Sequence, residues 1–562
     1  MQDIQGLANF LDDFMGGLQL IAYAMAVGGV LWALVVYRVS SDISPQRKFA
    51  LGLPAAGGAE DAVPHTAAAR MVRLIQLGAY ALAVTQATEI IMKGIVIATT
   101  LGEFDFLAYA GTVQFIAGVV RILLSAVLGW YVGRLRHEPF EVGHWRVVYL
   151  LTLPLILGGA WLVHAVGRFE YREPLMLLTI AHQLAAAVWV GGVIQLVALW
   201  HLQGNDEHAA RLWPTAVVRF GVLGVAAVAL LLATGSVLTF AYVGSWAGLL
   251  GSGYGSLVAT KLCLLVVVLA MAWYNRYAGQ GWQNRSDVAT ITGITPYVIE
   301  AEAFVLVSIL FIAATLSSQP PAVDIPELTA KVGEVLHMFA PRIPQLHSPS
   351  HAELLAGEVG RVAIVDKVPS VAGAQWSDFN HNIAGIFLTC MGVLALLSYH
   401  RWFRWARYWP AGFIGLGVFL FFRSDAETWP LGPIGFWEST FGNGEVLQHR
   451  MATFLALGLG VMEIKARVHE ELHPRLPYVF AALCALGGIL LLTHAHSEFE
   501  LKTEFLIQVT HTNMGMLAVL MAAGRWMELR LKSTAATVAG VFSMVAMVAI
   551  GFCLMFYKEP LF

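Results

Sequence analysis

The sequence predicts an all-α, polytopic integral membrane protein with about fourteen transmembrane helices in two bundles. Composition is one reason, because 58% of the 562 residues are hydrophobic and 13% are charged, whereas soluble domains are about 45–50% apolar and about 25% charged. Apolar runs long enough to cross a bilayer also recur along the chain. Basic residues gather in alternate loops between these runs, which is the distribution expected of cytoplasmic loops.

The predicted spans fall into two groups, separated by a proline-rich connection. We expect spans at about residues 16–38, 70–97, 107–135, 145–166, 174–201, 212–243, 257–276, 297–317, 380–399, 409–423, 447–465, 477–495, 507–525 and 535–557. The sequence therefore predicts an eight-helix membrane domain at 1–317, an extracytoplasmic connection at 318–377 and a six-helix membrane domain at 378–562.

The positions of Lys and Arg predict which loops face the cytoplasm. One alternating set of loops is basic, as where Arg401, Arg404 and Arg407 follow one another, while the opposite set has no basic residue between Thr99 and Asp105. Because short basic loops stay in the cytoplasm, we expect both termini on the periplasmic side of a bacterial inner membrane. The net charge of −3 gives no indication of nucleic-acid binding.

Histidines in the last third of the chain lie at the ends of apolar runs rather than in their middles. They are His381, His449 and His511, which open runs, and His494 and His496, which close one. If the runs cross the bilayer in alternation, all of them lie at the periplasmic boundary. Two histidines of the first domain, His164 and His182, are expected at the same boundary.

This set of side chains predicts a copper site. Imidazole binds copper, zinc and iron, and methionine beside it favours copper, Cu(I) in particular. The nearby methionines are Met176, Met451, Met514 and Met516. Polar groups that border the hydrocarbon are costly and usually functional, so we expect a shared site for Cu(I) or Cu(II). The alternative is haem b, because paired histidines on neighbouring helices, chosen among His381, His449, His494 and His511, match its ligation.

Charged residues also occur inside the first domain. Glu89 and Lys93 are four residues apart, hence on one helix face, and Arg121 lies near the middle of the next span. One interpretation is an ion pair that locks helices together, which we favour slightly. The other is a polar path for an ion or proton.

Several stretches resemble the copper-resistance D (CopD/PcoD) family of bacterial inner-membrane proteins. The clearest is His182 followed by small residues and Trp189-Val190-Gly191-Gly192. Others are Thr234-Gly235, Gly253-Tyr254-Gly255 with Lys261, Glu302, and Ser317 to Pro321. The last third is similar to the C-terminal extension of long family members, with His381, Trp429 to Pro433, His449, His494 and His496. The resemblance covers most of the chain and implies copper handling at the inner membrane together with periplasmic copper proteins.

These observations predict a copper-binding permease that captures copper at the periplasmic face, with uptake slightly favoured over export. Because the sequence has no Walker motif and no Cys-Pro-Cys element, we expect secondary or facilitated transport rather than an enzyme. The haem b or quinone-linked electron carrier remains the alternative. A second alternative is a non-transporting membrane subunit that docks a periplasmic copper-binding protein.

Overall fold

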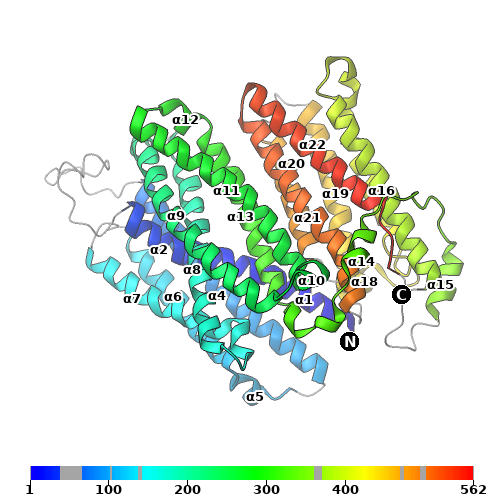
Figure 1. Ribbon diagram of the computed structural model, residues 1–562, viewed down its shortest axis with the longest axis horizontal. Helices are drawn as coiled ribbons and strands as arrows, with labels where there is room; N and C mark the ends of the chain where they lie inside the picture. Colours follow the sequence, from blue (N-terminus) through cyan, green and yellow to red (C-terminus); the bar gives the residue numbers. More distant parts are fainter. Residues whose placement is uncertain are drawn as a thin grey trace. The chain divides into compact units, whose positions relative to one another are not determined.

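The computed structural model describes residues 2–37, 66–101, 104–136, 142–204, 206–359, 370–468, 474–493 and 501–560. Most of these residues are helical, and an isolated bridge between Thr428 and Ile434 is the nearest approach to a strand that they contain. Figure 1 shows the helices as long rods that run alongside one another. The predicted all-α, polytopic class is thereby confirmed.

Eleven helical segments among the described residues are long and apolar enough to cross a membrane. Three predicted spans fall outside this set. The helix α17 (Ala411–Arg423) has 13 residues and α20 (Pro477–Leu492) has 16, so they rise only about 20–24 Å where the hydrocarbon measures about 30 Å. The helix α19 (Gly444–Val468) is long enough but carries Arg450 and Glu463 among its apolar residues. A count of fourteen therefore stays a prediction.

The chain forms two compact units. One comprises residues 14–241 and 265–317, called here the N-terminal unit, and the other comprises 1–13, 242–264 and 318–562, called the C-terminal unit. One boundary falls between Ser317 and Ser318, where the sequence predicts a domain boundary. The segment 242–264 groups with the later part of the chain. The full predicted division into 1–317, 318–377 and 378–562 stays a prediction.

The N-terminal unit is built from the first span and from helices that pack around α8. Its elements are α1 (Gln2–Tyr23, from residue 14), η1 (Ala24–Gly28), α2 (Gly29–Trp32), η2 (Ala33–Tyr37), α4 (Thr66–Leu101), α5 (Phe106–Ala110), α6 (Val113–Arg134), α7 (Val142–Gly158), η3 (Gly159–Leu162), η4 (His164–Gly167), α8 (Arg172–Trp200), α9 (Glu207–Val243), α11 (Gly253–Arg285, from residue 265), α12 (Val288–Gly293) and α13 (Thr295–Leu316).

Glycines set how closely α8 approaches the first span. A Cβ at Gly191 would lie 2.2 Å from the carbonyl oxygen of Ala24, and a Cβ at Gly28 would lie 1.9 Å from that of Ala187. Such close backbone contact is common where small residues meet in membrane helices. Gly191 of the Trp-x-Gly-Gly stretch therefore allows close packing of α8 on the first span, whereas Trp189 of the same stretch contacts a different part of the unit.

The C-terminal unit contains a helix bundle covered at one end by short segments. Its elements are α10 (Trp246–Gly251), η5 (Ala322–Asp324), η6 (Pro326–Leu328), α14 (Val332–Met338), α15 (His351–Val359), α16 (Val371–Leu397), η7 (Arg401–Tyr408), α17, α18 (Phe436–Gly442), α19, α20, α21 (Leu501–Arg530) and α22 (Ser533–Met555). The helix α22 packs between α16 and α21, and α20 packs against α19 and α21 (Figure 1).

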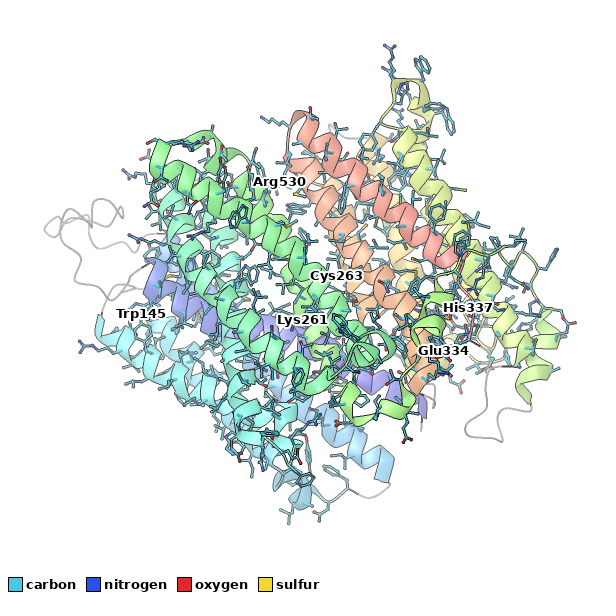
Figure 2. The ribbon with its side chains drawn as sticks, viewed as in Figure 1. Trp145, Lys261, Cys263, Glu334, His337 and Arg530 are labelled. Atoms are coloured by element: carbon cyan, nitrogen blue, oxygen red, sulfur yellow. The ribbon has the colours of Figure 1, made fainter. Side chains whose placement is uncertain are left out.

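Local capping fixes where two of these helices begin. The Ser370 hydroxyl accepts a hydrogen bond from the Gly373 N–H at the start of α16, and the Asn443 side chain accepts one from Glu445 N–H at the start of α19. Both contacts satisfy backbone donors that a first turn leaves without helical partners. The segment α14, whose Glu334 and His337 are labelled in Figure 2, is tied to α21 by an ion pair of 2.8 Å between Glu334 and Lys502.

Candidate metal site in the C-terminal unit

Three predicted histidines come together at one end of the C-terminal bundle. The rings of His381 on α16 and His511 on α21 have centroids 5.6 Å apart and meet edge to face. His449 on α19 interacts electrostatically with both. Tyr557, just beyond α22, packs its ring 4.1 Å from that of His381 and 6.1 Å from that of His511. The cluster thus joins the N-terminal halves of three helices to the segment just after a fourth.

Hydrogen bonds at Nδ1 fix the tautomer of all three imidazoles. The Nδ1 of His381 lies 2.9 Å from the carbonyl oxygen of Ser377, and that of His511 lies 3.0 Å from the carbonyl oxygen of Ile507. Because a carbonyl oxygen only accepts hydrogen bonds, Nδ1 must be the donor in both rings. The lone pair of each ring is then on Nε2, which is the arrangement seen when a histidine binds a metal through Nε2.

His449 has a stronger acceptor. Its Nδ1 lies 2.8 Å from Oδ1 of Asp425 in the loop that follows α17, and Ser424 donates to Oδ2 of the same carboxylate at 2.7 Å. Burial acts to raise the pKa of the Asp425 carboxyl, but its contacts with His449 and Ser424 outweigh burial and hold that pKa below its usual range. The next residue of α19, Arg450, donates to the carbonyl oxygen of Trp429 at 2.7 Å and so holds this loop against the helix.

A carboxylate and a phenol complete the surroundings of His381. The Tyr557 hydroxyl donates to Oε2 of Glu559 at 2.8 Å, and the Ser377 hydroxyl donates to the same oxygen at 2.7 Å. Burial raises the pKa of Glu559 to about 7. The Asn382 amide donates to the carbonyl oxygen of Tyr557 at 2.9 Å, which anchors the segment after α22 to α16.

Sequence analysis did not single out Tyr557 or Glu559. Both follow the last apolar run, and applying the alternation of spans to that run would place them at the same end as His381. The alternation of spans was therefore the one feature of the sequence that could have indicated these two residues, since no local motif marks either of them.

Exposure differs among the three histidines. The His449 side chain is 30% exposed, whereas His511 is only 7% exposed. Within the described ranges, no group of three or more His, Cys, Asp or Glu side chains stands in an arrangement that could already hold a metal ion. The three imidazoles are therefore neighbours that have not closed around one point.

The remaining predicted ligands lie elsewhere or outside the described residues. His494 and His496 fall outside them, and of His164 only the backbone, in η4, is described. His182 belongs to the N-terminal unit, where its Nδ1 lies 3.0 Å from Oγ1 of Thr234.

The four predicted methionines lie on α8, α19 and α21, and their role as ligands stays a prediction. Met514 is 2% exposed and packs with Ala518 and Ile550, and Met176 is buried in an apolar cluster of the N-terminal unit. Met451 and Met516 are partly buried on α19 and α21.

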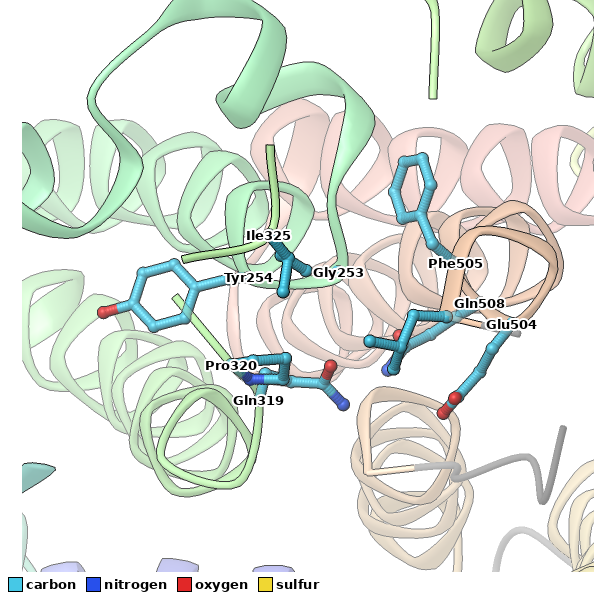
Figure 3. A pocket seen from close by; sticks show the side chains of 9 residues that line it. Gly253, Tyr254, Gln319, Pro320, Ile325, Glu504, Phe505 and Gln508 are labelled. Carbon is cyan, nitrogen blue, oxygen red and sulfur yellow. The ribbon is translucent and has the colours of Figure 1, made fainter. Parts of the chain in front are cut away.

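A small pocket lies beside the start of α21 (Figure 3). It is lined by Glu504 and Gln508 of α21, by Gly253 and by Gln319, and Figure 3 shows the Gln319 amide pointing toward Gln508. A Cβ at Gly253 would lie 3.0 Å from Oε1 of Gln319 and 3.3 Å from Oε1 of Gln508, so glycine leaves room for both amides. Gln508 lies three residues, about one helical turn, before His511 on α21.

The predicted intramembrane charges meet in the N-terminal unit. Glu89 pairs with Lys93 along α4 and accepts hydrogen bonds from Gln19 at 2.9 Å and Gln86 at 3.0 Å. The Arg121 guanidinium lies 5.4 Å from the centre of the Tyr23 ring. These contacts join three helices, as an interhelical lock requires. Glu89 and Lys93 also line a second small pocket.

The fold and the cluster define a polytopic membrane protein with imidazoles gathered at one end of a helix bundle. Residues 214–316 match the family model described as Copper resistance protein D, CopD. A curated relative, Copper transport protein CutJ of Bacillus subtilis (strain 168), is 26% identical over 218 residues, which are 39% of this chain and 38% of that protein. The chain thus matches well under half of that relative's length. No solved structure matches the chain.

These matches show that part of the chain is similar to the CopD family, which supports the family resemblance predicted from the sequence. The matched range includes Thr234, Gly253 and Glu302, whereas the histidine cluster of the C-terminal unit lies outside it.

Proposed function

We propose that this protein is a copper permease that captures copper at the periplasmic face of a bacterial inner membrane and moves it inward. The observation that carries the proposal is the common tautomer of His381, His449 and His511, whose Nδ1 atoms all donate to oxygen acceptors. His381 and His511 each carry an Nε2 lone pair, and His449 gains one when copper displaces its Nε2 proton; imidazole nitrogens of this kind suit copper. The CopD match and the printed name of the Bacillus relative support copper as the substrate.

The gradient of exposure suggests the order in which these ligands act. The His449 side chain is partly exposed, and His511 is nearly enclosed. Copper arriving at His449 would pass to the more enclosed rings as ligands exchange one at a time. Closure of the three rings around the ion is part of the proposal, since they are not yet arranged around one point.

Metal content tests the proposal directly. Purified wild-type protein incubated with copper and then desalted should retain copper, and His449→Ala, His381→Ala and His511→Ala should each retain less. His400→Ala is the matched control, because His400 is an exposed histidine at the opposite end of α16. Retention equal to wild type in all three cluster variants would remove these histidines from the mechanism.

The same preparation decides between copper and haem. A haem held by two of these histidines would give an absorbance band in the Soret region that His449→Ala or His511→Ala abolishes. The copper proposal expects colourless apo-protein and uptake of copper into vesicles that contain the protein. Copper binding without uptake would instead favour a membrane subunit that passes copper to or from a periplasmic protein.

A further inference from the structure

A buried carboxyl group in the N-terminal unit takes no part in the site described above. Glu302 on α13 is 2% exposed. Its Oε1 accepts a hydrogen bond of 2.7 Å from the indole N–H of Trp189 on α8, and its Oε2 accepts one of 2.7 Å from the side-chain amide of Asn275 on α11. Both oxygens are thus held by neutral donors that come from two other helices.

No cation accompanies this carboxyl group among the contacts of the described residues. Among the charged groups on these helices, His182 contacts Thr234, His201 contacts Glu300 and Arg276 contacts the Gly221 carbonyl oxygen. Lys261 also lies on α11, but fourteen residues before Asn275, which is about four helical turns away. An ionised carboxylate enclosed in this way loses its hydration without gaining a counter-charge, which is strongly unfavourable. Such a group is stable when it carries a proton, and in a membrane helix it is functional by default.

Asn275 is suited to both protonation states of Glu302. Its Nδ2 donates to the carboxyl group, while its Oδ1 is buried without a hydrogen-bond partner among the described residues. A side-chain amide carries a donor and an acceptor at nearly equivalent positions, and a half-turn exchanges them. With Nδ2 toward Glu302 the amide serves the carboxylate, and with Oδ1 toward Glu302 it accepts the O–H of the protonated acid.

The position of Trp189 links this group to a predicted ligand. Trp189 follows His182 by seven residues on α8, which is two helical turns and about 10 Å along the same face. The packing of Gly191 against the first span holds this part of α8 in place. Glu302 therefore lies on the same side of α8 as His182, deeper in the N-terminal unit.

We propose that Glu302 is a proton-binding site and that its proton is exchanged for copper movement, which makes the permease proton-coupled. The ligand is a single proton, taken up by the carboxylate to form the acid and released again when the state of the protein changes. The coupling part rests on the proposed copper transport, whereas proton binding by Glu302 stands by itself.

Infrared difference spectroscopy of the purified protein between alkaline and acidic pH tests proton binding without any transport assay. Wild type should show the C=O stretch of a buried carboxylic acid. Glu302→Gln should lose one component of that band, and Glu300→Gln, which alters a second buried acid on α13, should keep this component. Glu559, a buried acid of the C-terminal unit, contributes its own component to wild type and to both variants. A band unchanged in Glu302→Gln would overturn the proposal. Glutamine has nearly the same shape as glutamate, so Glu302→Gln is expected to fold, and its elution profile checks this. Asn275→Leu is a second variant, which removes the amide hydrogen bond to the carboxyl group and should shift the band.

Vesicles with copper outside and an imposed pH difference test the coupling. In wild type, reversing the pH difference should change the rate of copper uptake, and Glu302→Gln should lose that response while Glu300→Gln keeps it. A response to a sodium difference in place of the pH difference would overturn coupling to protons. If wild type moves no copper while the infrared band behaves as expected, the transport function fails and the proton site stands.

Discussion

Asp425→Asn tests whether the carboxylate behind His449 prepares that ring to bind copper. The wild-type carboxylate is 11% exposed and accepts the Nδ1–H of His449 at 2.8 Å. Asparagine has the same shape and keeps a neutral oxygen acceptor, so the variant removes the charge and leaves the packing. A charge-assisted hydrogen bond is about twice as strong as a neutral one, and low exposure limits screening of the lost charge.

The expected loss of copper affinity follows from this contact. Replacing the hydrogen-bond partner of a metal-binding histidine costs about 10–100-fold in metal affinity, which corresponds to about 1.4–2.7 kcal/mol. The neutral acceptor that remains places Asp425→Asn at the lower end of the range, and Asp425→Ala at the upper end. His449→Ala should weaken binding at least as much as Asp425→Ala, since it removes the ligand itself.

Competition with a colorimetric copper chelator measures these affinities on purified protein. Asp287→Asn is the control, because Asp287 also accepts a side-chain hydrogen bond but caps α12 in the N-terminal unit. The reasoning is refuted if Asp425→Asn and Asp425→Ala both bind copper within twofold of wild type while His449→Ala does not. His449 would then bind copper without needing its carboxylate partner.

Three further predictions concern stability, each measured by denaturation of the detergent-solubilised protein. Glu463 is fully buried and contacts two arginines at 2.8 and 2.9 Å, so Glu463→Ala should lower the free energy of unfolding by about 3–5 kcal/mol. Glu334→Ala removes a partly exposed ion pair and should lower it by no more than about 1 kcal/mol. Equal effects of the two variants would contradict this reasoning. Because the pKa of Glu559 is raised, the folded state holds this proton up to about pH 7, whereas the unfolded chain releases it near the ordinary pKa of 4.5. The free energy of unfolding should therefore fall as pH rises from about 4.5 to about 7, and Glu559→Gln should make this fall smaller. A Cβ at Gly385 would lie 2.1 Å from the backbone nitrogen of Met555, so Gly385→Ala should cost about 1–3 kcal/mol, while Gly442→Ala, where nothing lies within 4 Å, should be nearly neutral.

The sequence predicted the helical class and the grouping of three histidines for the same physical reason. Apolar runs indicate where helices cross the hydrocarbon, and successive spans cross it in opposite directions. Each end of a run can therefore be assigned to one face of the membrane. The depth of each histidine could not be predicted in this way. A span is expected from 380, but α16 begins at Val371 and places His381 ten residues inside the helix. Helical hydrogen bonding continues past the hydrocarbon boundary, so hydropathy marks the lipid contact rather than the helix end.

The partners of the histidines lay beyond sequence reasoning because they depend on how loops fold back. The pairing of Asp425 with His449 requires the loop after α17 to be held against α19 by Arg450. Glu559 reaches Ser377 across 182 positions of sequence. Neither pairing follows from helical periodicity, which relates residues within one helix only.

Met514 shows why closeness in sequence is a weak guide to a ligand set. It follows His511 by three residues, and sequence reasoning counted it as a possible thioether donor favouring Cu(I). In the structure its side chain is 2% exposed and packs with Ala518 and Ile550, the gap-filling role that methionine often has in apolar cores. Contacts described around His381 and His449 come from imidazoles, a phenol and carboxylates, and such donors suit Cu(II) as well as Cu(I). Binding measured for both oxidation states, with Met514→Leu beside wild type, would separate these cases, since an imidazole site should keep its affinity for both ions when the thioether is removed.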